Sequence, residues 1–138
     1  EGSSYPGYVA AFDAATGEAR GGFLTPSAVT AVRLAPDGRR AAVGLADGSV
    51  TVAGVTDGKL TRPTAVGKHV GPVRCVEFAA DRLFSGGADQ ELVGWDWAAG
   101  KRVSTFRHRA EVTSVAATAG REVVTTAADG RVYLWAVE

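Results

Sequence analysis

Two stretches of this chain, residues 89–95 (DQELVGW) and residues 129–135 (DGRVYLW), each place an aspartate six residues before a tryptophan. They lie forty positions apart, which identifies an internal repeat. A weaker third copy keeps Asp47 but carries Ala53 where the tryptophan would stand. Periods of about 40 to 45 residues with glycine turns and short apolar runs are typical of units built from four strands. The repeat therefore predicts an all-β architecture.

The runs between the turns predict four strands in each repeat. Aligned on the aspartates, residues 50–55, 92–97 and 132–137 are apolar enough to be strands buried on both faces. Two shorter strands precede each of them, joined by hairpin turns such as Pro36-Asp37-Gly38. A fourth run follows the opening strand at 7–13 and the first two of these buried strands, at residues 22–24, 60–64 and 103–106, and none follows the last. Four strands joined by hairpins make one blade of a β-propeller.

The chain of 138 residues has room for about three such blades, whereas closed propellers have about four to eight. We therefore expect a single incomplete propeller segment over residues 1–138. It opens with one strand of a partial blade at 7–13, and its repeats span about 18–55, 59–97 and 102–138. Both ends of this segment fall inside a blade and leave strand edges unpaired. We expect further blades to complete the propeller, either from copies of this chain or from a longer chain.

Composition and charge favour neither nucleic acid nor a membrane as partner. Fifteen Lys and Arg balance fifteen Asp and Glu, and the isoelectric point is near 7.0. No apolar run approaches the length of a membrane-spanning helix. Cys75 is alone, so the chain cannot form an intrachain disulfide, and the sequence favours the cytoplasm while leaving the compartment open.

With these spacings in place, the chain resembles the WD40-repeat β-propeller family. That family has a histidine before the first strand, a Ser or Thr in the second, an aspartate in the next turn and a tryptophan in the third strand. Two repeats carry this complete set, which we call a tetrad: His69, Ser85, Asp89 and Trp95, and His108, Thr125, Asp129 and Trp135. The first repeat departs from the pattern, with Thr25, Val43, Asp47 and Ala53 at the four places.

The set Ser85, His69 and Asp89 has two interpretations. The three residue types are those of a catalytic triad. In the alternative they are structural, since a chain of hydrogen bonds from aspartate to indole would satisfy every buried polar group. A catalytic triad occurs once, whereas this set recurs at the repeat spacing, so we favour the structural interpretation. The sequence accordingly predicts no catalytic residue, no cofactor and no metal site.

The resemblance implies a non-enzymatic scaffold for protein or peptide partners, bound through the loops at one end of the blades. On those loops we predict four polar contact residues: Arg74, Gln90, Arg109 and Glu111. The alternative function is a propeller module attached to a catalytic or signalling domain elsewhere in a longer protein. The identity of the partner and the total number of blades stay open.

Overall fold

The computed structural model describes residues 7–79, 81–118 and 121–136 of the chain. Residues 1–6, 80, 119–120 and 137–138, which include the last residue of the strand predicted at 132–137, lie outside the described residues. The described residues form strands and turns, and among them no helix is long and apolar enough to cross a membrane. The prediction of an all-β fold with antiparallel blades is confirmed.

The described residues contain fourteen strands, which form four antiparallel sheets. The first sheet pairs β1 (Gly7–Phe12) with β2 (Ala19–Thr25). The second contains β3 (Val29–Leu34), β4 (Arg40–Leu45), β5 (Ser49–Thr56), β6 (Lys59–Leu60) and β7 (Thr64–Lys68). The third contains β8 (Val73–Ala79), β9 (Arg82–Gly87), β10 (Glu91–Asp96) and β11 (Lys101–Arg107). The fourth contains β12 (Val112–Ala117), β13 (Glu122–Ala127) and β14 (Val132–Ala136).

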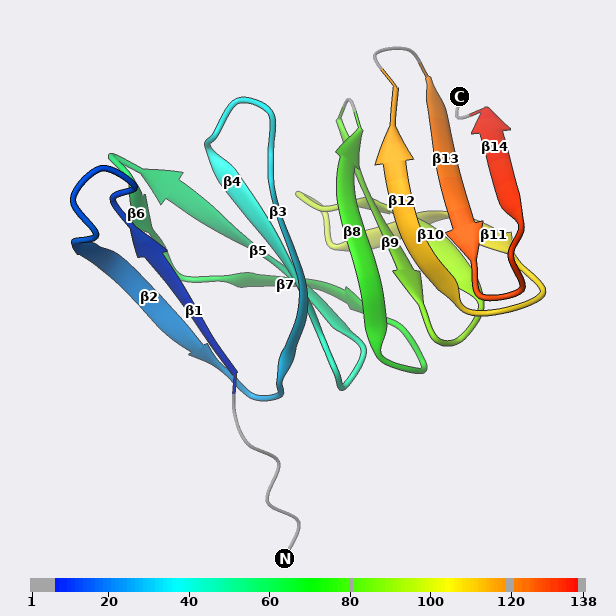
Figure 1. Cartoon of the computed structure of the whole chain (residues 1–138), viewed down its shortest axis with the longest axis horizontal. Helices are drawn as coiled ribbons and strands as arrows, with labels where there is room; N and C mark the ends of the chain where they lie inside the picture. Colours follow the sequence, from blue (N-terminus) through cyan, green and yellow to red (C-terminus); the bar gives the residue numbers. More distant parts are fainter. Residues whose placement is uncertain (1–6, 80, 119–120, 137–138) are drawn as a thin grey trace, which may run out of the picture.

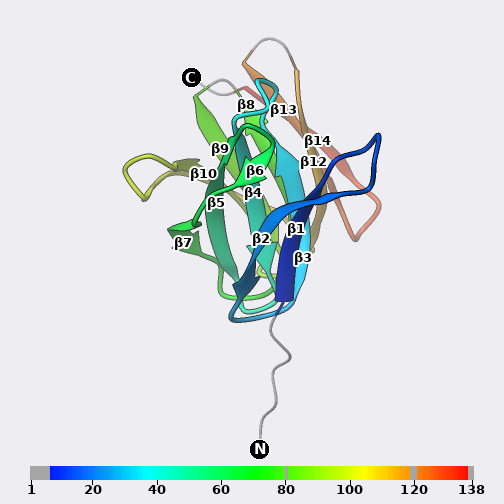
Figure 2. The ribbon, with the colours of Figure 1, turned by 90° about the vertical axis from the view of Figure 1, so that its left-hand side faces the viewer.

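The sheets follow one another across the molecule in chain order, from β1–β2 at one side to β12–β14 at the other (Figure 1). Seen from the β1–β2 side, the later sheets lie behind one another (Figure 2). Strands β3, β8 and β12 each open a sheet, and β8 packs against both of the others. Each sheet is therefore stabilised mainly by the sheets beside it.

The second sheet differs from the sequence expectation at its outer edge. We expected one strand at residues 60–64, but the structure has β6 and β7 with residues 61–63 between them. Pro63 has no backbone N–H with which to continue a ladder. The Thr61 hydroxyl instead accepts a hydrogen bond from the Gly54 N–H at 3.0 Å. The prediction was wrong because a proline divides the run.

Two apolar cores lie between the three larger sheets. The first joins β4, β5 and β7 to β8, β9 and β10, and it is built of Ala42, Val50, Val52, Val66, Val73, Val76, Phe78, Leu83, Val93 and Trp95. The second joins the β8–β11 sheet to the β12–β14 sheet and is built of Phe84, Leu92, Val115 and Val123. In β9, Leu83 enters the first core and its neighbour Phe84 the second. The β8–β11 sheet is thus buried on both faces.

A close contact between a glycine and a valine recurs between these sheets and sets how closely they pack. A Cβ atom placed on Gly44 of β4 would lie 2.7 Å from Cβ of Val73, and one placed on Gly86 of β9 would lie 2.8 Å from Cβ of Val112. Real Cβ atoms do not come so close. Both valines are fully buried, so each fills the space that a side chain at the glycine would need.

The last expected strand is not buried as predicted. Residues 132–137 were expected to be covered on both faces, but Val132 and Leu134 of β14 are 68% and 65% exposed. Tyr133 and Trp135 alternate with them and are partly covered. Among the described residues, the β12–β14 sheet packs on one face only, against the β8–β11 sheet, so Val132 and Leu134 are left uncovered.

Phe84→Ala should destabilise the protein by about 3 to 5 kcal/mol, because it empties the centre of the second core. Val132→Ala, on the exposed strand β14, should change the free energy of unfolding by less than about 0.5 kcal/mol. Urea unfolding of the two variants measures the difference. Equal losses would mean that the β8–β11 and β12–β14 sheets do not pack as described.

Candidate functional site

The loops that carry the predicted site residues gather at one end of the sheets. In the β8–β11 sheet, Val73 pairs with Gly87 and Glu91 pairs with Arg107. The start of β8, the turn between β9 and β10, and the end of β11 therefore lie together. They form the lower edge of the molecule in Figure 1. We call this edge the loop face.

In the second repeat, the structure brings all four tetrad residues together. Nδ1 of His69 lies 3.0 Å from Oδ2 of Asp89, and Nε2 of His69 lies 2.7 Å from Oγ of Ser85. Nε1 of Trp95 donates to the same Ser85 oxygen at 2.7 Å. His69, Ser85 and Trp95 are buried, while the carboxylate of Asp89 lies at the edge of the core.

The direction of each hydrogen bond follows from what each group can do. The Trp95 indole can only donate, so the Ser85 oxygen accepts from it and gives its own proton to Nε2 of His69. The remaining ring proton is then on Nδ1, from which it is donated to Asp89. Every polar atom of the tetrad has a partner, which removes the desolvation penalty of burying them.

The aspartate connects this buried chain to the loop face. It accepts backbone hydrogen bonds from Val70 at 3.1 Å and from Glu91 at 3.2 Å. Burial on its own raises the pKa of Asp89, but the His69 ring and these hydrogen bonds outweigh it and hold the pKa below its usual value. The charged carboxylate thus holds the loop before β8 against the turn before β10.

In the third repeat, three of the four residues meet. Nε2 of His108 lies 2.8 Å from Oγ1 of Thr125, and the Trp135 indole donates to that oxygen at 3.0 Å. Nδ1 of His108 lies 3.2 Å from the carbonyl oxygen of Phe106. Asp129, the fourth residue, instead accepts from the Arg131 N–H at 3.1 Å within its own turn.

The first repeat has apolar side chains at two of the tetrad positions, so it buries no polar side chain there. Val43 and Ala53 replace the hydroxyl and the tryptophan, and both are fully buried. Thr25 occupies the place of the histidine and donates to the Ser27 carbonyl at 2.7 Å. Asp47 accepts from the Ser49 N–H in its turn. Replacing both members of a buried hydrogen bond leaves no unpaired group, so the substitution is tolerated.

The predicted contact residues all lie at the loop face, but they do not form one cluster. Arg74 and Glu111 pair with each other, with Nε of the arginine donating to Oε1 of the glutamate at 3.1 Å. Gln90 and Arg109 are exposed. The Gln90 carbonyl oxygen accepts from the His108 N–H at 2.8 Å, which ties the turn before β10 to the loop before β12.

One exposed hydrophobic side chain escaped the sequence interpretation. Val70, next to the tetrad histidine, is 94% exposed on the loop face. An apolar residue in a Gly- and Pro-containing loop was the signal that could have found it. Trp97, half-buried, packs against the first core, and the Arg40 guanidinium lies 4.4 Å from its ring centre.

Other reactive groups give no sign of a chemical site. Burial raises the pKa of the Cys75 thiol to about 11, so the thiolate is scarce at neutral pH. Within the described residues, no three His, Cys, Asp or Glu side chains are grouped so as to hold a metal ion.

Comparison with known proteins agrees with this geometry. A family model described as WD domain, G-beta repeat matches residues 100–136, which contain all four tetrad residues of the third repeat, His108, Thr125, Asp129 and Trp135. Residues 100–136 of the chain thus match a WD40 repeat. The computationally designed Ika4 protein superposes with a TM-score of 0.82 at 25% identity, over 96% of this chain and 81% of that one. U3-55K superposes with a TM-score of 0.83 at 18% identity, over 94% of this chain and 42% of that one.

One curated relative is the 66 kDa stress protein of Physarum polycephalum, 31% identical over 113 residues. The match covers 78% of this chain but only 19% of that protein. The chain thus spans about a fifth of the length of the curated relative that it matches.

Ser85→Ala should destabilise this chain by about 1 to 3 kcal/mol, because it leaves the Trp95 N–H and the His69 ring nitrogen without their shared partner. Thr64→Ala, at the exposed start of β7, should change stability by less than about 0.5 kcal/mol. Thermal unfolding of both variants makes the comparison. A stability of Ser85→Ala equal to that of the wild type would show that the buried hydrogen bonds contribute nothing.

The stability of the fold should decrease as the pH falls below 6.5, in part through His108. Burial lowers the pKa of His108 below its ordinary 6.5, against smaller opposite effects of the Phe106 carbonyl and Asp129. The unfolded chain therefore takes up the proton first, so this contribution is complete above pH 6.5 and is lost at lower pH. Urea unfolding between pH 7.5 and 5 should show a smaller loss for His108→Asn. Identical pH dependence in the two proteins would remove His108 as a cause.

Proposed function

We propose that the chain is a non-enzymatic scaffold that binds a protein or peptide partner through its loop face. WD40 repeats in general serve protein interaction and not catalysis. The observation that carries the proposal for this chain is the backbone conformation of Gln90, which has a φ of 73°.

Gln90 occupies a position that favours glycine. The corresponding residues of the other two turns are Gly48 and Gly130, with φ of 94° and 83°. A residue with a Cβ atom is less stable than glycine in this left-handed region by about 1 kcal/mol. Strain of this kind is concentrated at binding sites, where the side chain is used. We infer that the exposed Gln90 side chain is kept for contact with a partner.

The surroundings of Gln90 suit a protein surface. Exposed Val70 supplies an apolar centre, and it is held by the hydrogen bond from its N–H to Asp89. Arg109 adds an exposed positive charge, while the Arg74–Glu111 pair lies at the boundary between two sheets. A small apolar centre within a polar border is the usual composition of transient interfaces.

The tetrads have a structural role in this proposal. Ser85 is fully buried, and its oxygen already accepts from Trp95 and donates to His69. A serine nucleophile must instead be exposed to substrate and activated by a free ring nitrogen. Loss of a hydrolytic activity in Ser85→Ala, with the fold intact, would contradict this assignment.

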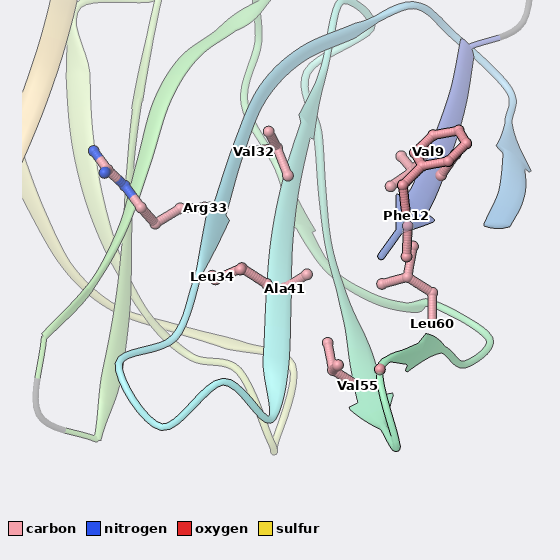
Figure 3. A pocket seen from close by; sticks show the side chains of 11 residues that line it. Val9, Phe12, Val32, Arg33, Leu34, Ala41, Val55 and Leu60 are labelled. Carbon is pink, nitrogen blue, oxygen red and sulfur yellow. The ribbon is translucent and has the colours of Figure 1, made fainter. Parts of the chain in front are cut away.

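We also propose that further blades complete this propeller segment, whose repeats span 18–55, 59–97 and 102–138. An apolar cleft of about 710 Å³ lies between β1 and the β3–β6 sheet, lined by Val9, Phe12, Val32, Leu34, Val55 and Leu60, with Arg33 nearby (Figure 3). In each of the two apolar cores, the corresponding space between neighbouring sheets holds the first two strands of a sheet, such as β8 and β9 in the second core. The first sheet has only β1 and β2 among the described residues, so the cleft fits one more hairpin.

A second candidate function is that of a module within a longer protein with a catalytic or signalling part. The small share of the Physarum polycephalum protein that the match covers supports it. Both candidates use the loop face in the same way, so one experiment on that face serves both.

Gln90→Gly should stabilise the chain by up to about 1 kcal/mol and weaken partner binding at the same time. A photo-crosslinking residue at Val70 should capture a protein partner in the cells that make this chain, whereas one at Asp37, in a turn at the opposite end, should not. Gln90→Gly should reduce the Val70 adduct. Equal capture from both ends, or no effect of Gln90→Gly, would contradict the loop face as the binding surface.

A further inference from the structure

The glycine–valine contact between sheets is absent at one place where the repeat would put it. Gly44 and Gly86 occupy equivalent positions, each three residues before the aspartate of its turn. The residue at that position of the third repeat is Thr126. It lies on the face of the β12–β14 sheet that, within the described residues, no other sheet covers.

Thr126 has its own local partners on that face. Its hydroxyl lies 2.8 Å from the Thr113 hydroxyl and 2.7 Å from the Ser114 hydroxyl. The other side chains of the face include Leu134, which is 65% exposed. The face is therefore apolar with a cluster of three hydroxyls at one end, which we call the hydroxyl cluster.

The threonine side chain occupies the space that valine fills in the other two contacts. A Cβ atom at Gly44 or Gly86 would come within 3 Å of the valine of the next sheet, and Thr126 has that Cβ atom and two γ atoms in addition. A sheet that packs here as the β8–β11 sheet packs on its neighbour cannot carry valine at the corresponding position. Overpacking of this kind is relieved only by a smaller residue.

The charges of the inner contacts are also missing from this face. Arg74 of β8 pairs with Glu111 across the boundary between sheets, and Arg33 of β3 pairs with Glu77. Thr113 stands at the position of Arg74, and Ala116 stands at the position of Arg33 and Glu77. An acidic residue brought here in the place of Glu111 would meet Thr113 where Glu111 meets Arg74.

We propose that the outer face of the β12–β14 sheet accepts a β-sheet whose first strand carries Gly, Ala or Ser where β8 and β12 carry Val73 and Val112. A second copy of this chain that placed its β3 on this face would bring Val29 to that position and so fit poorly. The proposal rests on the proposed completion of the propeller and adds a rule for the next blade: the neighbour must be a different repeat.

An extended chain tests this rule. Residues 59–97 are appended behind residue 138, so that a copy of the second repeat can supply an outer strand for β14 and begin a fourth large sheet. Its Val73 then faces Thr126. Four proteins are compared: the extended chain, the same chain with Thr126→Gly, with Val73→Gly in the appended copy, and with both changes.

Thr126→Gly should destabilise the original chain but stabilise the extended chain. In the original chain it removes two hydroxyl contacts and should lower the folded-to-unfolded ratio about fivefold. In the extended chain it restores the glycine–valine contact and should raise that ratio about tenfold. Val73→Gly in the appended copy should also stabilise the extended chain, and the double change should be less stable than either single change. Thr113→Gly, a matched loss on the adjacent strand, should destabilise both chains.

Hydrogen exchange separates the possible outcomes. Protection of the appended amides in the two single variants but weaker protection in the unchanged extended chain supports the rule. Equal protection in all four proteins would overturn the rule while leaving the docking face intact. Exchange at unfolded rates in all four would overturn both the rule and the proposed completion of the propeller. Association of wild-type copies that Val29→Asp abolishes, measured by sedimentation equilibrium, would also overturn the rule.

Discussion

Close packing between neighbouring sheets is the constraint on which the rest of this structure depends. The β8–β11 sheet has apolar side chains on both faces, so it is stable only between two other sheets. Glycine at positions 44 and 86 lets the branched side chains of Val73 and Val112 reach the neighbouring backbone. A larger residue there would separate the sheets and open both cores, since protein interiors leave few voids.

Such packing leaves no solvent to pair with polar groups inside the sheets. The repeats either pair these groups with one another or replace them with apolar side chains. The second repeat buries a serine, a histidine and an indole and connects them in one chain that ends at Asp89. The first repeat places Val43 and Ala53 at the corresponding positions. Both arrangements avoid an unpaired buried group, which is the costly case. The polar version has a further effect, because Asp89 also holds the Val70 backbone and so shapes the loop face.

Much of the fold could be predicted from the repeat. The alternation of apolar residues and the spacing of the turn residues located the strands, because hydrophobic period and turn chemistry are local properties. The interruption between β6 and β7 was missed although Pro63 was visible in the sequence, since the run was read for hydrophobicity alone. The exposure of Val132 and Leu134 could not be foreseen from their own strand, because burial depends on whether another sheet lies against it.

The sequence by itself determined the order of the strands and the residue types of both tetrads, since these follow from spacing and from local turn preferences. Only the tertiary structure decided that His108 bonds the Phe106 carbonyl and Asp129 its own turn, that Arg74 and Glu111 neutralise each other, and that Gln90 has a left-handed backbone. These outcomes depend on distances of a few ångströms between segments far apart in the chain. Sequence spacing sets which residues can meet, whereas the packing of one sheet on the next sets which of them do.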